Sequence, residues 1–332
     1  MKKNKILFSV DPIMKEYYSV FEEKLKKYFE NPVCIHGSDP SKYEMSFFIK
    51  KVKVFSRYRG TFGKFFRKKY QNYLQNHYKK LIEEHKDSDY ILAVGGVHYN
   101  NTFLKNLKKV NPNIRTIAFL WDKFSEEITL AYKKDYDIVY TFERDIAQKY
   151  NLKFRPSFYV EKMDEKKDVD CYYVGTLREK DRYYKIKEIY EYCKRNDLKS
   201  YLKLFVEKDT MKAEFKNSKI LSKKKISYKK NLECSSKSKA IIELNYKNQK
   251  GLTLRSLECI GLKSKLITEN RDIKNYDFYD SDNIYIIDSI DSIKNIPLDF
   301  FKKDYKSLGK NIEKKYSLEG FLEEIFEEGE NL

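Results

Sequence analysis

Proline, glycine and cysteine are scarce in this chain, with 6, 11 and 5 copies among 332 residues, and tryptophan occurs once. No low-complexity tract and no internal repeat is visible, which argues against a repeat architecture. The cysteines are odd in number and widely spaced, so they favour buried thiols in a reducing cytosol over a disulfide framework or a zinc site. They are Cys34, Cys171, Cys193, Cys234 and Cys259.

Long hydrophobic runs are missing as well. No run approaches the roughly 18 to 20 apolar residues that a membrane span needs. The run from Ile6 to Val10, which follows the first lysines, is too short for a signal peptide. We therefore expect a cytoplasmic protein, with a peripheral contact to the inner membrane face as a further expectation.

Several catalytic motifs are absent. The chain has no Gly-x-Gly-x-x-Gly after a strand, no Walker A run and no Gly-x-Ser-x-Gly, which argues against a dehydrogenase, an ATP hydrolase and an α/β-hydrolase. Asp-x-Asp triplets occur, but each precedes a predicted strand, so we interpret them as solvated loop acids away from any metal site. These triplets are Asp87 and Asp89, Asp135 and Asp137, Asp168 and Asp170, and Asp280 and Asp282.

The charge is strongly one-sided, with a formal net charge of +18. Such a balance predicts an anionic partner, although AT-rich coding explains part of the lysine excess. The segment from Lys50 to Lys80 holds eleven Lys or Arg and no acid, interleaved with Phe and Tyr. A solvated face, a contact with anionic membrane headgroups and a nucleic-acid surface all remain open for it. A stripe at helical spacing is expected to pack on the core: Phe62, Phe66, Tyr70, Tyr73, His77 and Leu81.

Strands and helices alternate along the chain, which predicts two doubly wound α/β domains. The polar segment Val160 to Asp168 reads as the linker, so we place the domains at 1–160 and 161–332, with the last helix able to pack back on the first domain. Expected strands of the first domain are 5–10, 32–36, 89–94, 115–120, 137–141 and 154–159. Those of the second are 170–174, 199–206, 219–221, 240–244, 265–268 and 283–287.

One stretch organises the second domain: GLTLRSLECIG, from Gly251 to Gly261, lies between two short apolar runs. This pattern predicts a strand, a loop, a helix and a strand, and the helix start is a natural site for phosphate because its first amides are unpaired. Arg255 and Glu258 share one face of that helix, where they suit phosphate and ribose. An ordinary surface ion pair is the alternative.

The spacing Gly251, Arg255, Glu258, Gly261 resembles the donor-site signature of GT-B glycosyltransferases of the bacterial capsule, lipopolysaccharide and spore-surface type. The strand and loop from Asp170 to Arg182 are similar to the loop that opens the donor domain in these enzymes. Many retaining members carry a second glutamate eight positions earlier, where this chain has Lys250. The resemblance implies two Rossmann-like domains facing across a cleft, a nucleotide-sugar co-substrate, no cofactor and no essential metal.

Ligands of such sheets bind beyond the carboxyl ends of the strands, where the strand order reverses. Candidates in the second domain are Gly175, Thr176, Arg178, Asn245, Gly251, Leu252, Thr253, Arg255 and Glu258. We assign Glu258 to the ribose and Arg255 or Arg178 to the pyrophosphate, with Arg182 as a further cation. In the first domain, Asp122 is the first choice for a general base, ahead of Asp11 and His98. Gly95, Gly96 and Trp121 lie at the same expected edge.

The sequence therefore predicts a metal-independent glycosyltransferase that moves a sugar from a nucleotide diphosphate to a surface glycan or a lipid-linked acceptor. The main alternative is a non-catalytic or nucleic-acid-binding protein that uses the segment 50–80. A nucleotide-sugar epimerase of the same fold is a second alternative.

Overall fold

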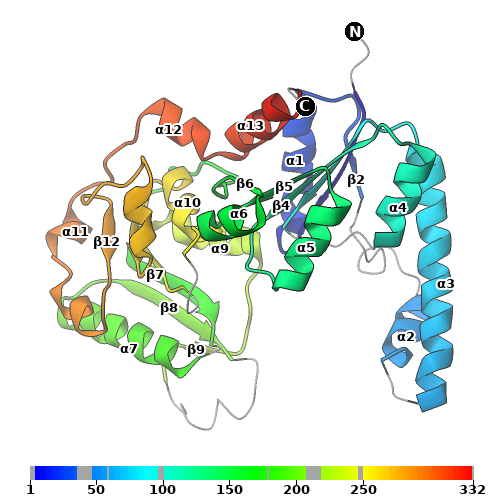
Figure 1. Cartoon of the computed structure of the whole chain (residues 1–332). Helices are drawn as coiled ribbons and strands as arrows, with labels where there is room; N and C mark the ends of the chain where they lie inside the picture. Colours follow the sequence, from blue (N-terminus) through cyan, green and yellow to red (C-terminus); the bar gives the residue numbers. More distant parts are fainter. Residues whose placement is uncertain are drawn as a thin grey trace. The chain divides into compact units, whose positions relative to one another are not determined.

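The computed structural model describes residues 4–35, 47–57, 60–95, 101–177, 179–206, 218–245 and 250–330. The chain divides into two compact units, Met1–Arg155 and Pro156–Leu332, each of which is described here by itself (Figure 1). Each unit contains one six-stranded sheet in which every pairing is parallel. Two doubly wound α/β sheets are thus confirmed.

The sheet of the first unit has the strand order β2-β1-β3-β4-β5-β6. Its order reverses between β1 and β3, where the second strand has been placed on one side of the first and the third on the other. The inner strands are buried along their length because helices cover both faces of a parallel sheet. The strands are β1 (Ile6–Val10), β2 (Val33–Cys34), β3 (Tyr90–Val94), β4 (Arg115–Leu120), β5 (Ile138–Thr141) and β6 (Lys153–Phe154).

Side-chain caps start two of the helical segments of this unit. Asp11 starts the first helical segment by accepting a hydrogen bond from the Ile13 amide at 2.9 Å, and the Ser125 side chain caps α5 in the same way. The helices are η1 (Pro12–Tyr17), α1 (Tyr18–Leu25), α2 (Phe47–Phe55), α3 (Gly60–His85), α4 (Asn101–Val110), α5 (Glu126–Asp135) and α6 (Arg144–Tyr150).

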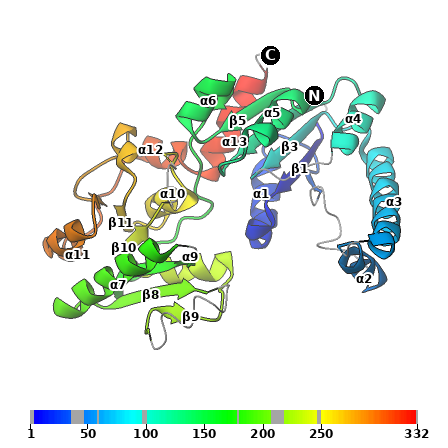
Figure 2. The same ribbon diagram turned by 60° about the horizontal axis from the view of Figure 1, so that its bottom comes forward.

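The sheet of the second unit has the order β9-β8-β7-β10-β11-β12 and reverses between β7 and β10. Counted from its first strand this is the order 3-2-1-4-5-6 of dinucleotide-binding sheets. Figure 2 shows α7 running along β8 in this unit. The strands are β7 (Val169–Thr176), β8 (Ser200–Phe205), β9 (Leu221–Ser222), β10 (Ser238–Glu243), β11 (Lys265–Thr268) and β12 (Ile284–Ile286).

The core of the second unit joins α7 to the sheet through fully buried side chains such as Ile186, Leu204 and Ile242. The thiols of Cys171 and Cys193 lie in this core, and none of the five cysteines forms a disulfide. The helices are α7 (Lys180–Arg195), α9 (Tyr228–Ser236), α10 (Leu254–Gly261), η3 (Arg271–Asn275), η4 (Asp291–Asn295), α11 (Asp299–Lys302), α12 (Lys310–Lys315) and α13 (Leu318–Glu330).

The aromatic stripe of the basic segment is less buried than we predicted. On α3 only Gly63, Tyr78 and Ile82 are buried, whereas Phe62 is 55% exposed. The first half of α3 packs on α2 rather than on the sheet. The ring centroid of Phe55 on α2 lies 5.8 Å from that of Phe62 and 5.2 Å from that of Phe66. The prediction of core packing was therefore wrong for this half, because Phe62 and Phe66 contact Phe55 of α2 instead. Figure 1 shows α2 beside this half of α3.

The last predicted strand of the first half was also too long. The segment 154–159 was expected to form a strand, but β6 ends at Phe154. Pro156 follows, and a proline has no amide hydrogen to continue a ladder. Tyr159 instead makes an isolated bridge to Ser317 inside the second unit. Among the described helices none is long and apolar enough to cross a membrane.

Candidate functional site

Arg255 joins the two strands at which the order of the second sheet reverses. From α10 its Nη2 donates to the Val174 carbonyl of β7 at 2.8 Å, and its Nη1 donates to the Ile242 carbonyl of β10 at 3.4 Å. The guanidinium also lies 5.4 Å from the centroid of the Tyr173 ring, within cation–π range. Arg255 therefore holds the helix at the reversal and is not a simple surface ion-pair partner.

Arg182 makes a second connection between the same strands. Its Nη1 donates to the Thr176 carbonyl and its Nη2 to the Leu244 carbonyl, both at 3.2 Å. Both arginines are half-buried. Parallel sheets bind ligands outside the carboxyl ends of strands at this point, so two fixed cations stand where an anionic ligand would bind.

Glu243, the last residue of β10, fixes the start of α10 to the sheet. Its carboxylate is 2% exposed and accepts hydrogen bonds from the hydroxyls of Thr253, of Ser256 at 2.6 Å and of Thr268 at 2.6 Å. A buried carboxylate without donors would cost several kcal/mol. The sequence analysis missed this residue, although an acid inside the apolar run AIIEL was a usable signal.

The first backbone amides of α10 are not capped by a side chain. Thr253 occupies the N-cap position, but its hydroxyl donates to Glu243 and no side chain caps the first turn. Gly251 and Leu252 are buried just before the helix. Asn270 donates to the carbonyls of Lys250 at 2.9 Å and of Gly251 at 3.3 Å, which fixes the approach of the loop. This arrangement fits an anion at the helix start.

Glu258 lies one turn into α10 and is 4% exposed. Its Oε1 accepts a hydrogen bond of 2.5 Å from the Tyr228 hydroxyl at the start of α9. Burial raises the pKa of Glu258, and the nearby Glu243 adds to this, while the Tyr228 hydroxyl and the Arg255 charge oppose it. Tyr228 was not among the predicted residues, and its sequence context carries no signal for this contact.

Two further predicted residues lie at the same strand ends. A β-carbon on Gly175 would come within 2.4 Å of the Tyr173 hydroxyl, so a larger residue there would require the buried Tyr173 ring to shift. The Oδ1 atom of Asn245 is buried and has no hydrogen-bond partner among the described residues. An unsatisfied buried oxygen is costly, so it is available to a ligand. Arg178 lies outside the described residues.

The structure shows why glycine occupies position 261, which the sequence did not reveal. A β-carbon there would lie 2.5 Å from Cδ2 of Tyr159 and 2.6 Å from the Glu161 carbonyl oxygen. The Met163 amide donates to the Gly261 carbonyl at 3.0 Å. The chain that enters the second unit therefore packs directly on the end of α10, and the signature glycine permits that contact.

In the first unit, the predicted residues Asp11 and Gly95 follow the two strands at the reversal. The Asp11 amide donates to the Val94 carbonyl at 3.1 Å, and the Asp11 carboxylate caps η1. Gly95 has a φ of +88°, and a β-carbon there would meet the Trp121 ring at 2.4 Å. The only tryptophan thus packs against the turn after β3.

Asp122 follows β4, the strand next to β3, and its carboxylate is exposed. It accepts a hydrogen bond of 2.8 Å from the Lys123 amide. It therefore lies at the carboxyl edge of the first sheet, as the strand pattern predicted. Gly96 and His98 lie outside the described residues.

The Asp-x-Asp acids lie at the opposite, amino-terminal edges, as their place before the predicted strands indicated. Asp170 is not the solvated loop acid that we expected, because it lies inside β7 and its side chain is only 15% exposed. At least one acid of each triplet binds a neighbouring amide or lysine at these edges. The contacts are Lys5 N to Asp89 at 2.7 Å, Thr116 N to Asp137 at 2.8 Å, Lys199 N to Asp170 at 2.8 Å and Lys306 Nζ to Asp280 at 2.7 Å. Within the described part of the chain no group of three His, Cys, Asp or Glu side chains could hold a metal ion.

Comparisons in sequence find no match, either to a protein-family model or to a curated protein. Solved structures do match. The Anabaena protein HepE, in complex with UDP and glucose, has a TM-score of 0.61 at 9% identity, over 99% of this chain and 100% of that one. A UDP-forming α,α-trehalose-phosphate synthase from Burkholderia xenovorans, in complex with glucose-6-phosphate, has a TM-score of 0.55 at 9% identity, over 98% and 99%.

A UDP-N-acetylglucosamine 2-epimerase also matches, with a TM-score of 0.51 at 11% identity, over 99% of this chain and 97% of that one. At such identities a structural likeness shows the fold alone. The fold is that of the GT-B enzymes, with one parallel six-stranded sheet in each unit.

Proposed function

We propose that the protein is a glycosyltransferase that takes a sugar from a nucleotide-diphosphate sugar. The observation that carries this proposal is the buried carboxylate of Glu258, one turn into a helix that starts uncapped where the second sheet reverses. This combination offers amides for a diphosphate and a carboxylate for ribose hydroxyls. The matched Anabaena structure, which holds UDP, supports a uridine nucleotide as the first donor to test.

The proposed donor site uses the two arginines as fixed positive charge. Arg182 and Arg255 are already oriented by strand carbonyls, so little reorganisation is needed when a diphosphate leaves. This assignment would let the reaction proceed without a metal ion, as the sequence analysis predicted. Asn245 offers its unsatisfied oxygen to the nucleotide at the same edge.

The acceptor is proposed to bind the first unit, with Asp122 as general base if the reaction inverts the anomeric carbon. Its exposed position beyond β4 supports this role. Asp11 is weaker, because its carboxylate already caps η1. A growing capsule, lipopolysaccharide or spore-surface glycan on a lipid carrier is the proposed acceptor class.

The α2–α3 hairpin is proposed as the contact with an anionic membrane surface that carries such an acceptor. Four apolar side chains of this hairpin, Phe48, Val54, Phe62 and Phe65, are 52–65% exposed. The same segment exposes the basic residues Lys51, Arg57, Lys64, Arg67, Lys68 and Lys69. Each lysine or arginine near an anionic bilayer contributes about 1 kcal/mol. Sedimentation with phosphatidylglycerol vesicles tests this, with phosphatidylcholine vesicles and RNA as the contrasting partners.

Titration calorimetry with UDP, GDP, CDP and TDP, in EDTA and then with magnesium, tests the donor site. We expect one nucleotide to bind the wild type, and Glu258→Gln to weaken that binding at least about tenfold, the effect of one hydrogen bond to a charged group. Glu233→Gln is the matched control, because this half-exposed acid on α9 pairs with Lys230 at 3.1 Å. Equal binding by Glu258→Gln and the wild type would remove the ribose assignment.

The epimerase match leaves one second candidate of the same fold. An epimerase converts its nucleotide sugar without an acceptor, whereas a transferase needs one. Incubation with the identified nucleotide sugar alone, followed by analysis of the sugar, separates the two. An altered sugar still attached to its nucleotide would favour the epimerase.

A further inference from the structure

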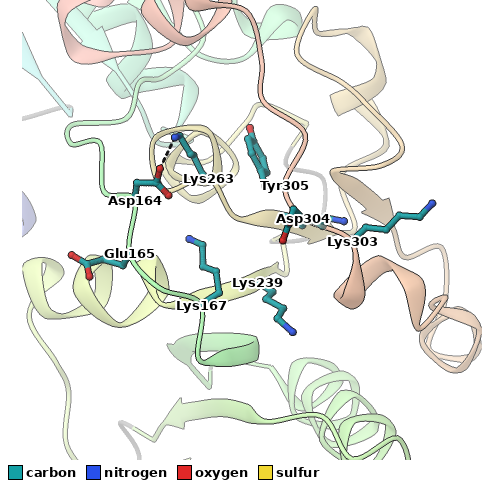
Figure 3. Close-up of a pocket in the computed structure, with 9 residues that line it drawn as sticks. Asp164, Glu165, Lys167, Lys239, Lys263, Lys303, Asp304 and Tyr305 are labelled. Atoms are coloured by element: carbon teal, nitrogen blue, oxygen red, sulfur yellow. Dashed lines mark hydrogen bonds and ion pairs between the residues drawn. The ribbon is translucent and has the colours of Figure 1, made fainter.

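A lysine-rich cavity lies at the amino-terminal edge of the second sheet, opposite to the proposed donor site. Its volume is about 390 Å³, within the range of small-molecule sites. It is bounded by the starts of β10 and β11, by the chain before β7 and by the chain after α11 (Figure 3). The lining residues are Asp164, Glu165, Lys167, Lys239, Lys263, Lys265, Lys303, Asp304 and Tyr305.

The lysines of this cavity are only partly neutralised. Lys263 pairs with Asp164 at 2.6 Å, a contact drawn in Figure 3, and Lys239 pairs with Asp170 at 2.7 Å. Among the described residues, no ion pair is formed by three of the cavity lysines, Lys167, Lys265 and Lys303, whereas the acids lining the cavity apart from Asp164 are only Glu165 and Asp304. Positive charge is therefore in excess around the cavity.

Lys167 and Lys265 differ sharply in how their ammonium groups are satisfied. Lys167 Nζ donates to the carbonyls of Ser236 at 2.6 Å and Leu262 at 2.7 Å and to the Ser264 hydroxyl at 3.1 Å. An ammonium has three donors, so Lys167 is fully bonded. Lys265 is 2% exposed, and its Nζ has no hydrogen-bond acceptor among the described residues.

The surroundings of Lys265 disfavour the charged form of its side chain. Its Nζ lies 5.0 Å from the centroid of the Phe300 ring. Burial lowers the pKa of Lys265, the Lys303 charge lowers it further, and the Asp282 and Asp304 charges oppose this. A buried ammonium without acceptors destabilises the fold. Its flexible stem allows it to turn toward an acceptor in the cavity.

We propose that this cavity binds a small phosphate-bearing anion, with the Lys265 ammonium as its buried hydrogen-bond donor and Lys303 at its rim. A phosphate supplies several strong acceptor oxygens and the negative charge that the cavity lacks. The Tyr305 side chain also lines the cavity. Inorganic phosphate and a phosphate monoester share this chemistry.

The site is separate from the proposed donor site. The cavity lies at the starts of β10 and β11, whereas Glu243 and Thr268 lie at their ends. Strands advance about 3.3 Å per residue, so the length of a strand separates the two. The two proposals therefore stand or fail independently.

The test is titration calorimetry of the full chain with inorganic phosphate, pyrophosphate and glycerol 3-phosphate, at ionic strength held constant with chloride. We expect Lys265→Met to weaken binding at least about tenfold, as loss of a hydrogen bond to a charged group does. Lys294→Met, a surface lysine that pairs with Asp291, should bind as the wild type does. Preference among the three anions distinguishes free phosphate from a monoester.

Two outcomes overturn the proposal. One is equal binding by wild type and Lys265→Met, and the other is binding lost in Glu258→Gln but kept in Lys265→Met, which would place the anion at the donor edge. Lys303→Gln, which changes an exposed rim residue, is the second variant if Lys265→Met does not fold. It should weaken binding by roughly two- to fivefold, the usual effect of an exposed ion pair, and unchanged binding there counts against the proposal.

Discussion

The Tyr228 hydroxyl donates to Glu258 Oε1 over 2.5 Å, so the carboxylate proposed for the ribose already has a protein partner. The two residues come from the first turn of α9 and the middle of α10. A nucleotide that uses Glu258 must share this carboxylate with Tyr228 or displace its hydroxyl. The contact therefore couples the stability of the second unit to the proposed donor site.

Tyr228→Phe should destabilise the protein by about 1–3 kcal/mol, because it removes a donor from a buried carboxylate. Urea unfolding at pH 7 measures this. In a Glu258→Gln background the same change should cost less, since the carboxamide carries no charge to be stabilised. A cost that is identical in both backgrounds would show that the two side chains do not interact.

The raised pKa of Glu258 predicts a pH dependence. The folded state prefers the protonated carboxyl, so this contribution to stability is present below the ordinary pKa of 4.5 and is lost as the pH rises through the raised value. The free energy of unfolding of wild type, relative to Glu258→Gln, should therefore fall as the pH increases from 4 to 7. A difference that stays constant over this range contradicts a raised pKa.

Gly261→Ala should destabilise the protein by about 1–3 kcal/mol through overpacking against the Glu161 carbonyl and the Tyr159 ring. Helix propensity alone predicts the opposite sign, a gain of about 1 kcal/mol. Thermal unfolding decides between them. Gly309→Ala is the matched control, because no atom lies within 4 Å of a β-carbon there, and we expect a change of less than about 1 kcal/mol.

Asp122→Asn should reduce turnover by about 10²–10⁴ if the carboxylate is the general base. The exposed carboxylate accepts a hydrogen bond from the neighbouring Lys123 amide, so we expect unfolding to change little. Product formation with the identified donor and acceptor is the measurement. Turnover at the wild-type rate in a folded Asp122→Asn protein would move the role to another group.

Most of the fold could be predicted because hydrophobic runs in a parallel sheet are easy to locate. Arg115–Leu120 and Lys265–Thr268 were expected with the bounds that the structure has, since both are short apolar runs between polar turns. The segment after Phe154 was wrongly expected to continue the strand, because its apolar residues suggested pairing that Pro156, without an amide hydrogen, does not allow. The half-exposed stripe on α3 was misjudged because periodicity does not reveal which partner covers a helix face.

The site was predictable only in part. The place of Gly251, Arg255 and Glu258 around one helix start was predicted from their spacing, and the structure has that helix. The bonds of Arg255 to Val174 and Ile242 could not be predicted, because they join carbonyls on two strands far apart in the sequence. Tyr228 was missed for the same reason. Lys265 lay in an expected strand, but the sequence does not show that its ammonium is buried beside Phe300 with no hydrogen-bond acceptor among the described residues.

The two sheets place their reversals differently, and this limits how the halves could be exchanged. In both units the first strand borders the reversal, but its partner there is the third strand of the first unit, β3, and the fourth strand of the second, β10. Each half has six strands, but a simple tandem duplication would also have left the same strand order in both halves. A chimera that swaps loops between them should therefore match loops by their position at the reversal and not by their order along the chain.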